Sequence, residues 1–209
     1  MPQLIDIQPK PKELVKDIRA FRRFLKQNPS AERSQFLPFF AKHEQLCAFM
    51  ATFHTKVKSG TQLKLEADLW SDFTCDLIAG SKSDRAFVFV EFEDAKPQSL
   101  FRPKKGRKNS YWGNRVEQGF SQVVDWLFRI DSEGGSATLE RDFGARQLNT
   151  MGIVITGRSH DVSAYDRLRL DWRSSNTSVG KARVAFFTYD DLLEWLEGRT
   201  QVIKLSIKP

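Results

Sequence analysis

The chain has 209 residues, of which 40% are hydrophobic, so it is long enough for one sizeable core with an extension. No stretch approaches the ~18 consecutive apolar residues of a membrane span, and the first residues lack the apolar segment of a secretory signal, so we expect a cytoplasmic protein without membrane partners. Lysine and arginine number 33 against 26 acidic residues, and the net charge of +7 favours a polyanionic partner.

The first 58 residues are expected to form an N-terminal helical extension. Residues 12–26 carry apolar side chains at spacings of four, three and four, which predicts an amphipathic helix. Its opposite face is basic and could follow a phosphate backbone, although a solvated face is the simpler interpretation. A second helix is expected to begin between residues 31 and 38 and to end near Phe53, with an apolar face broad enough to be buried against a sheet.

Residues 62–93 are expected to form three strands. Residues 62–69 alternate leucine and alanine with charged side chains, residues 80–85 are typical of a turn, and the segments 72–78 and 86–93 on either side of the turn predict a β-hairpin. Strand side chains alternate between the two faces of a sheet. One face of the last strand therefore carries Val88, Val90 and Phe92, and the other carries Phe87, Phe89, Glu91 and Glu93.

Three carboxylates can meet on this hairpin, because Asp76 lies on the strand that pairs with the one carrying Glu91 and Glu93. Burying that much negative charge without compensation is costly, and a divalent cation removes the cost. Mg²⁺, for which Mn²⁺ can substitute, takes oxygen ligands from one or two carboxylates together with water and phosphate. We therefore expect these three residues to be metal ligands. Glu66, on the preceding strand, is either a fourth acidic group at the site or part of a solvent-exposed strand face.

The segment 101–115 combines basic side chains with aromatic ones and glycine. The basic residues are Arg102, Lys104, Lys105, Arg107, Lys108 and Arg115. Such cations can neutralise phosphates, and an aromatic side chain such as Trp112 can stack on a base, so we expect this segment to bind DNA. The alternative is a solvated connector, against which Trp112 argues because an exposed loop gains little from a lone tryptophan.

The remainder of the chain predicts helices that alternate with strands. Residues 115–130 form a strongly amphipathic helix, and Gln122 lies on its polar face, where it is either a ligand of a metal-bound water or phosphate or an ordinary surface residue. A short helix is expected at 138–143, a buried strand at 151–156, a helix at 163–174 and a strand at 185–187. A further helix begins at Thr188 and ends at Gly198, before a final strand at 201–207. This order predicts a layered α/β domain.

An aspartate at the end of one strand, followed after a short turn by Glu-x-Glu on the next, resembles the restriction-endonuclease-like PD-(D/E)xK nuclease fold, a mixed sheet flanked by helices. With GFSQVVDWLFRI at 119–130 and FFTYDDLLEWL at 186–196, residues 60–196 resemble the nuclease domain of the Shedu antiphage family. The resemblance implies a nuclease-like domain at residues 59–209, with Asp76 and Glu91 as metal ligands and Gln122 in the place of the family's helix glutamine.

The same resemblance implies a metal-dependent DNA endonuclease in antiphage defence that assembles as a homo-oligomer. Glu93 stands where the family usually has lysine, a replacement that some restriction endonucleases also have. Lys96, three residues further on, is either a substitute catalytic cation or a surface lysine. The alternative function is a catalytically degenerate DNA-binding or sensing module on the same fold.

Overall fold

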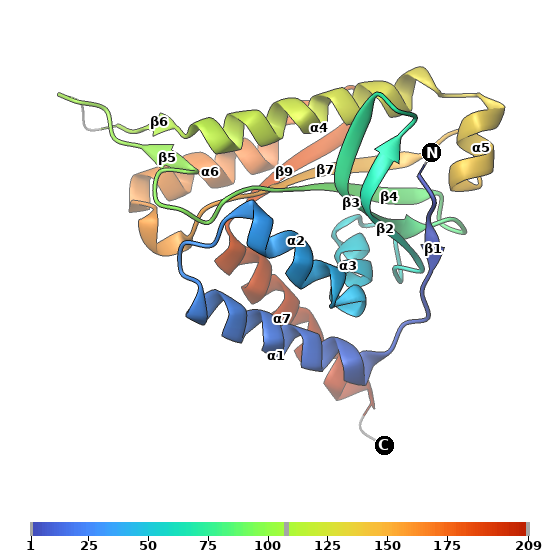
Figure 1. Cartoon of the computed structure of the whole chain (residues 1–209), viewed down its shortest axis with the longest axis horizontal. Coiled ribbons are helices and arrows are strands. Elements are labelled where there is room, and N and C mark those ends of the chain that lie inside the picture. Colours follow the sequence, from blue (N-terminus) through green and yellow to red (C-terminus); the bar gives the residue numbers. More distant parts are fainter. Residues whose placement is uncertain (1, 107–108, 208–209) are drawn as a thin grey trace.

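The computed structural model describes residues 2–106 and 109–207, and side chains up to residue 200. Its centre is a seven-stranded mixed sheet in the order β1-β2-β3-β4-β7-β9-β8 (Figure 1). The strands are β1 (Ile5–Asp6), β2 (Gln62–Leu69), β3 (Phe73–Ser81), β4 (Ala86–Phe92), β7 (Asn149–Ile155), β8 (Ser178–Val179) and β9 (Ala182–Phe187). Strands β1 to β4 pair antiparallel, β4, β7 and β9 are parallel, and β8 is antiparallel to β9. The α/β class and the β3–β4 hairpin are therefore confirmed.

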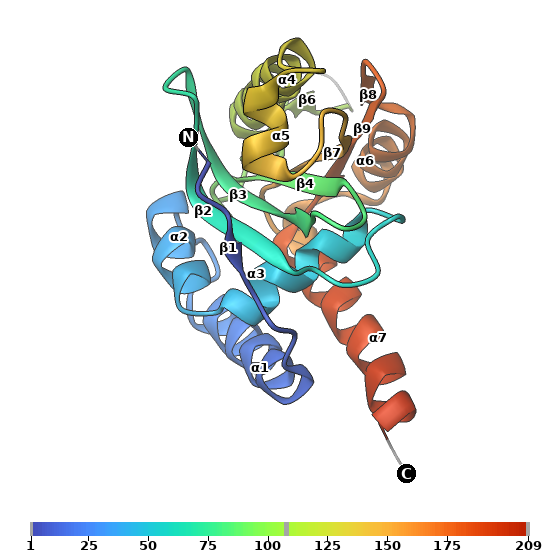
Figure 2. The ribbon, with the colours of Figure 1, turned by 90° about the vertical axis from the view of Figure 1, so that its right-hand side faces the viewer.

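Helices cover both faces of the sheet, as the two views in Figures 1 and 2 show. One face packs against α1 (Pro11–Gln27), α2 (Arg33–Ala41), α3 (Glu44–Met50) and α7 (Tyr189–Ile207). The other packs against α4 (Asn114–Ser132), α5 (Ala137–Phe143) and α6 (Ala164–Asn176). The short 3₁₀ helices η1 (Ala51–Phe53) and η2 (Ser159–Asp161) lie in connections. The predicted alternation in β4 is confirmed, because Val88, Val90 and Phe92 enter the first core while Phe87 and Phe89 enter the second.

Two predicted elements differ from the structure. The single helix expected up to Phe53 is divided into α2, α3 and η1, because the backbone leaves the helical region at His43, whose imidazole Nδ1 lies 2.7 Å from the carbonyl oxygen of Phe39. In a continuous helix that carbonyl would bond the backbone N–H of His43 instead. The strand expected at 201–207 is also wrong, because α7 continues through Gly198 to Ile207. Glycine in a helix interior costs only about 1 kcal/mol relative to alanine and does not by itself end the helix.

The N-terminal 58 residues are integrated with the sheet. Strand β1 pairs with β2, and the apolar side chains of α1, α2 and α3 share one core with β3 and β4. In that core the ring of Phe36 on α2 stacks on Tyr189 of α7 with centroids 3.7 Å apart. Helix α2 is thereby held against the end of β4, where the carboxylates lie. The boundary at residue 58 remains a prediction.

Strand β2 changes which core it faces at Glu66. This residue has a φ of 44°, in the left-handed region that side chains other than glycine rarely adopt. Leu63 and Leu65 pack in the core with α1 to α3, whereas Ala67 and Leu69 pack in the core with α4. The side chain of Glu66 itself is exposed.

Candidate active site

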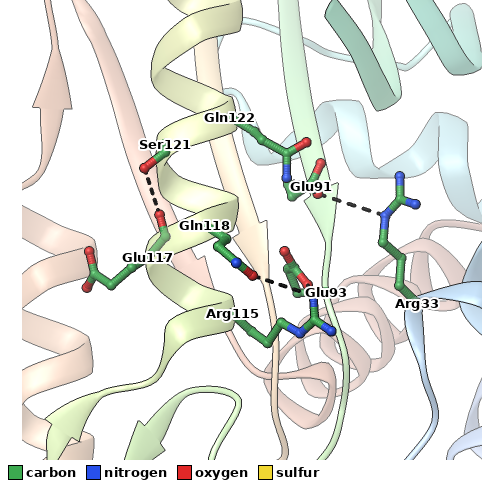
Figure 3. A pocket seen from close by; sticks show the side chains of 8 residues that line it. All are labelled: Arg33, Glu91, Glu93, Arg115, Glu117, Gln118, Ser121 and Gln122. Carbon is green, nitrogen blue, oxygen red and sulfur yellow. Dashed lines mark hydrogen bonds and ion pairs between the residues drawn. The ribbon is translucent and has the colours of Figure 1, made fainter.

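An open cavity of about 620 Å³ lies between the end of β4, the N-terminal half of α4 and the start of α2 (Figure 3). The residues that line it all have polar or charged side chains. The lining residues are Arg33, Glu91, Glu93, Arg115, Glu117, Gln118, Ser121 and Gln122. The structure therefore brings two of the three predicted metal ligands, and Gln122, to one cavity.

Glu91 and Glu93 are buried at the base of this cavity, with only 1% and 3% of their surfaces exposed. Strand periodicity turns both side chains towards α4, and Gly119 allows the helix to pass over them. A Cβ atom at Gly119 would lie 3.0 Å from Cγ1 of Val154 and 3.3 Å from the Cγ atoms of both glutamates. Glycine therefore sets how closely the helix approaches the carboxylates. A glycine inside an otherwise regular amphipathic pattern is the sequence feature that indicates such a close contact.

Asp76 is fully buried beside Glu91. The antiparallel pairing of β3 and β4 runs to Leu77 and Val90, and Asp76 and Glu91 are the neighbouring residues just beyond that pair. The backbone N–H of Phe92 donates a hydrogen bond of 3.0 Å to Oδ2 of Asp76. The hairpin thus places the third predicted carboxylate next to Glu91.

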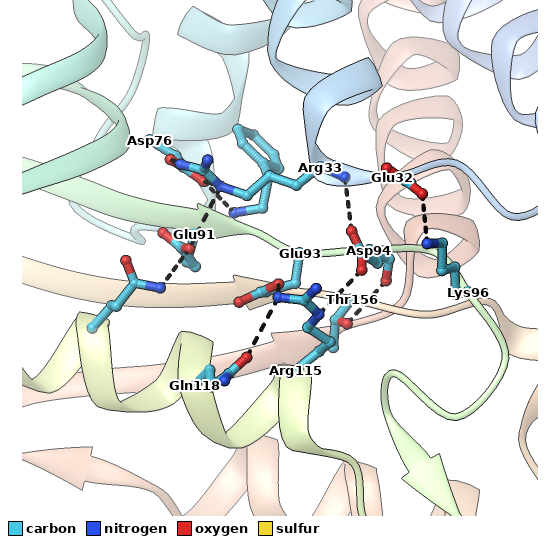
Figure 4. Close-up of polar contacts among 12 residues, drawn as sticks. Glu32, Arg33, Asp76, Glu91, Glu93, Asp94, Lys96, Arg115, Gln118 and Thr156 are labelled. Carbon is cyan, nitrogen blue, oxygen red and sulfur yellow. Dashed lines mark hydrogen bonds and ion pairs between the residues drawn. The ribbon is translucent and has the colours of Figure 1, made fainter.

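Arg33, at the start of α2, binds this cluster from the opposite side (Figure 4). Its Nε donates to Oδ2 of Asp76 at 3.1 Å, its Nη2 forms a very short contact with Oδ1, and Nε lies 3.9 Å from Oε1 of Glu91. The guanidinium therefore compensates part of the buried negative charge. No local pattern in the sequence indicates this role, because it depends on how α2 packs against β4.

The remaining contacts leave two carboxylate oxygens unsatisfied. Gln122 Nε2 donates to Oε1 of Glu91 at 2.9 Å, whereas Oε2 of Glu91 and Oε2 of Glu93 are buried without a hydrogen-bond partner among the described residues. Arg115 Nη1 is 3.7 Å from Oε2 of Glu93, and its Nε pairs with Asp94 at 3.1 Å. Buried acceptors without partners are rare and costly, so these oxygens point to a proton or a cation at the site.

Burial shifts the acidity of the cluster. Desolvation, followed by the charge of Asp76, raises the pKa of Glu91 to about 9. Desolvation also raises the pKa of Glu93 to about 7 against the opposing charge of Arg115. The pKa of Asp76 is raised by burial too, although its hydrogen bond from Arg33 opposes the shift. Shifts of this kind are typical of functional sites.

Glu91 and Glu93 leave oxygens that fit a hard divalent cation, whereas Asp76 is bound by Arg33. Within residues 2–106 and 109–207, no three His, Cys, Asp or Glu side chains are arranged to hold a metal ion as they stand. Both oxygens of Asp76 are bonded within the protein, whereas Glu91 and Glu93 each offer one unpaired oxygen. Mg²⁺ commonly takes one or two protein carboxylates and completes its shell with water. The donor set is therefore suitable for this ion.

Two other predicted site residues lie outside the carboxylate cluster. Glu66 is exposed on β2, so its side chain is not buried with Asp76. Lys96 forms a surface ion pair of 2.6 Å with Glu32, and both side chains are about half exposed. The residue that reaches Glu93 with a positive charge is instead Arg115, which the sequence placed in the DNA-binding segment.

That segment forms a small antiparallel ribbon of β5 (Phe101–Arg102) and β6 (Tyr111–Trp112), and Figure 1 shows it projecting from one end of the molecule. Lys104 Nζ lies 4.1 Å from the ring centre of Tyr111, and Trp112 stacks on Phe101 at 4.5 Å. Among the described ion pairs, none involves Arg102, Lys104 or Lys105. Arg107 and Lys108 lie outside the described residues. The ribbon thus presents uncompensated positive charge beside aromatic rings.

Helix α6 extends this surface. Arg173 lies over the ring of Trp112 at 4.5 Å, and both residues line a second cavity of about 590 Å³ with Arg169 and Trp172. Trp172 is 70% exposed. Aromatic and basic groups therefore continue from the ribbon onto α6.

The chain matches the family described as Shedu protein SduA, C-terminal, over residues 16–193. The fold and the site define the class of protein. It is an α/β domain whose mixed sheet carries a buried carboxylate cluster beneath a polar cavity. The chain belongs to this Shedu family, and the match spans most of its length. No curated protein matches it. In the part of the chain that the structure describes, no helix is long and apolar enough to cross a membrane.

Replacing Gly119 by leucine should lower the melting temperature by roughly 3–10 °C, because forcing extra atoms into a packed contact costs about 1–3 kcal/mol. The larger side chain would also push α4 away from Glu91 and Glu93. Ser121→Leu is the matched control, since position 121 is exposed on the same helix and should change stability by less than about 0.5 kcal/mol. Equal melting temperatures for the two variants would show that the close approach at Gly119 is not required.

In EDTA, the free energy of unfolding should decrease as the pH rises from the ordinary glutamate pKa of 4.5 towards 9. Unfolded Glu91 releases its proton near 4.5, whereas the folded protein keeps the proton until the pKa of about 9. The folded state therefore binds more protons in this window, and raising the pH favours unfolding. Glu93, with its pKa raised to about 7, adds to the decrease in the lower part of the window.

Thermal melting of the wild type and Glu91→Gln across this pH range measures the effect. The variant should be less pH-dependent and, near pH 8, should melt about 3 °C or more above the wild type, because glutamine is neutral without taking up a proton on folding. Parallel curves for the two proteins would contradict the raised pKa of Glu91.

Proposed function

We propose that this chain is a metal-dependent DNA endonuclease of the PD-(D/E)xK type that acts in antiphage defence. The observation that carries the proposal is the pair of unpartnered, buried carboxylate oxygens of Glu91 and Glu93, next to Asp76 at the base of an open cavity. Membership of the Shedu family supports the defence role. The basic ribbon β5–β6 supports DNA as the substrate.

Asp76 and Glu91 would hold Mg²⁺ or Mn²⁺, and Glu93 is positioned as a further ligand or as a base. The bound ion supplies positive charge to the phosphoryl oxygen and to the leaving oxygen. Gln122 fixes the orientation of Glu91 through its 2.9 Å hydrogen bond. Arg115 keeps positive charge at the cavity wall, where it can meet a phosphate of the DNA backbone.

Glu93 gives this site its own route to an activated water. Glu93 lines the cavity, and its Oε2 has no hydrogen-bond partner among the described residues, although Arg115 Nη1 lies 3.7 Å away as an ion-pair partner. A carboxylate oxygen in this position can accept a proton from the attacking water. The carboxylate can therefore take over proton transfer where the family usually has a lysine.

The rival function is a DNA-binding or sensing module without catalysis. One observation favours this non-catalytic module: Arg33 already compensates the charge of Asp76 without a metal. Incubation of the protein with supercoiled and linear DNA in Mg²⁺, Mn²⁺ or EDTA separates the two functions. Cleavage that depends on the metal supports the endonuclease, whereas binding without cleavage under every condition supports the module.

A further inference from the structure

Arg33 is unusual because it closes the carboxylate cluster from an element outside the hairpin. Asp76 is fully buried, whereas 41% of the Arg33 side chain is exposed at the mouth of the cavity. The guanidinium occupies both oxygens of Asp76 and approaches Glu91. It thus holds the place where a cation shared by these two carboxylates would bind.

The backbone of Arg33 is anchored independently of its side chain. Its N–H donates to Oδ1 of Asp94 at 2.9 Å, and the N–H of Ala95 donates to the carbonyl oxygen of Ala31 at 2.8 Å. The start of α2 is therefore tied to the segment that follows β4. The guanidinium can leave Asp76 by rotation about side-chain bonds alone, without displacing the helix.

A guanidinium held against both oxygens of Asp76 competes with a divalent cation for them. Oδ2 already accepts hydrogen bonds from Nε of Arg33 and from the backbone N–H of Phe92, Nη2 contacts Oδ1, and two positive groups at that distance repel in a buried site. Since arginine remains charged at all working pH values, the released side chain can bind another anion. A DNA phosphate at the cavity mouth fits its planar, two-pronged donor geometry.

We propose that Arg33 and the divalent cation bind Asp76 and Glu91 in mutually exclusive fashion, and that the released guanidinium then binds a phosphate of the DNA. This inference rests on the proposed nuclease function, and it makes Arg33 a substrate-positioning residue. Metal binding would therefore be coupled to DNA binding through one side chain. The metal-free protein would keep its acidic cluster closed.

The test is Ca²⁺ titration by calorimetry and binding of a short DNA duplex in Ca²⁺, for wild type, Arg33→Ala and Arg33→Gln. Removing the competitor should tighten Ca²⁺ binding by about 5–150-fold, the usual range for coupled sites. The same variants should bind DNA more weakly in Ca²⁺, with a salt slope smaller by roughly 0.9 for the lost phosphate contact. Arg22→Ala is the matched control, since Arg22 pairs with Glu197 on the surface and its loss removes the same charge.

Tighter Ca²⁺ binding together with weaker DNA binding in the Arg33 variants indicates the exchange. If Arg33 were purely structural, its loss would weaken both the Ca²⁺ affinity and the DNA affinity. Arg33→Gln keeps most of the side chain without its charge, so it replaces Arg33→Ala if that variant does not fold. Suppose that the wild type and both Arg33 variants bind Ca²⁺ with equal affinity while Asp76→Asn loses binding. Arg33 and the cation would then not exclude each other, and the proposed nuclease function would still stand. Absence of Ca²⁺ binding in the wild type and in both Arg33 variants would overturn the nuclease function itself.

Discussion

Asp76→Asn and Glu91→Gln should each reduce metal-dependent cleavage of plasmid DNA by on the order of a thousandfold or more, because a bound metal contributes several kcal/mol of charge stabilisation. Both residues are buried at the centre of the cluster. Plasmid nicking measures the rate, and calorimetric titration with Mn²⁺ measures the loss of metal affinity.

The loss should not result from unfolding. Asp76→Asn removes one negative charge from a buried acidic cluster, although it also deprives Arg33 of its charged partner. Glu91→Gln replaces a carboxyl group that the folded protein keeps protonated below its pKa of about 9 with a neutral group of the same shape. Glu117→Gln is the matched control, because Glu117 lines the same cavity but is about half exposed and pairs with Arg173. It should cleave within a few-fold of wild type. If both cluster variants cleave DNA as the wild type does, the hairpin is not part of the active site.

Replacing Arg102, Lys104 and Lys105 together by alanine should weaken DNA binding of any sequence. Each lost phosphate contact reduces the dependence of log affinity on log salt by up to ~0.9, so the triple variant should lose up to ~2.7 in slope. At moderate salt this corresponds to a loss of affinity of roughly ten- to several hundredfold. Fluorescence anisotropy at several salt concentrations measures both quantities.

A triple variant of Arg19, Arg23 and Lys26 is the control for net charge. These residues are exposed on α1, the other basic face that the sequence offered for phosphate binding. The α1 variant should retain most of the affinity and the salt slope. Equal losses in the two variants would mean that DNA binding follows overall charge, and a loss confined to α1 would move the interface there.

The periodicity of the sequence determined which side chains share a face. Alternation in β4 places Glu91 and Glu93 together on the face opposite Val88, and a spacing of three and four puts Gln122 on the face of α4 that reaches them. These are local consequences of strand and helix geometry. The positive charge of the β5–β6 ribbon likewise follows from its composition alone, whatever its conformation.

Only the tertiary structure decided which charges meet. Arg33 and Asp76 are separated by 43 positions and join because the core between Phe36, Phe40 and β4 docks α2 over the end of the hairpin. Lys96, near Glu93 in sequence, pairs instead with Glu32 from the same docked segment. Sequence patterns report which face of an element is buried, whereas the partners of a buried charge depend on how separate elements pack. That packing is why a guanidinium from the N-terminal helices completes the carboxylate site.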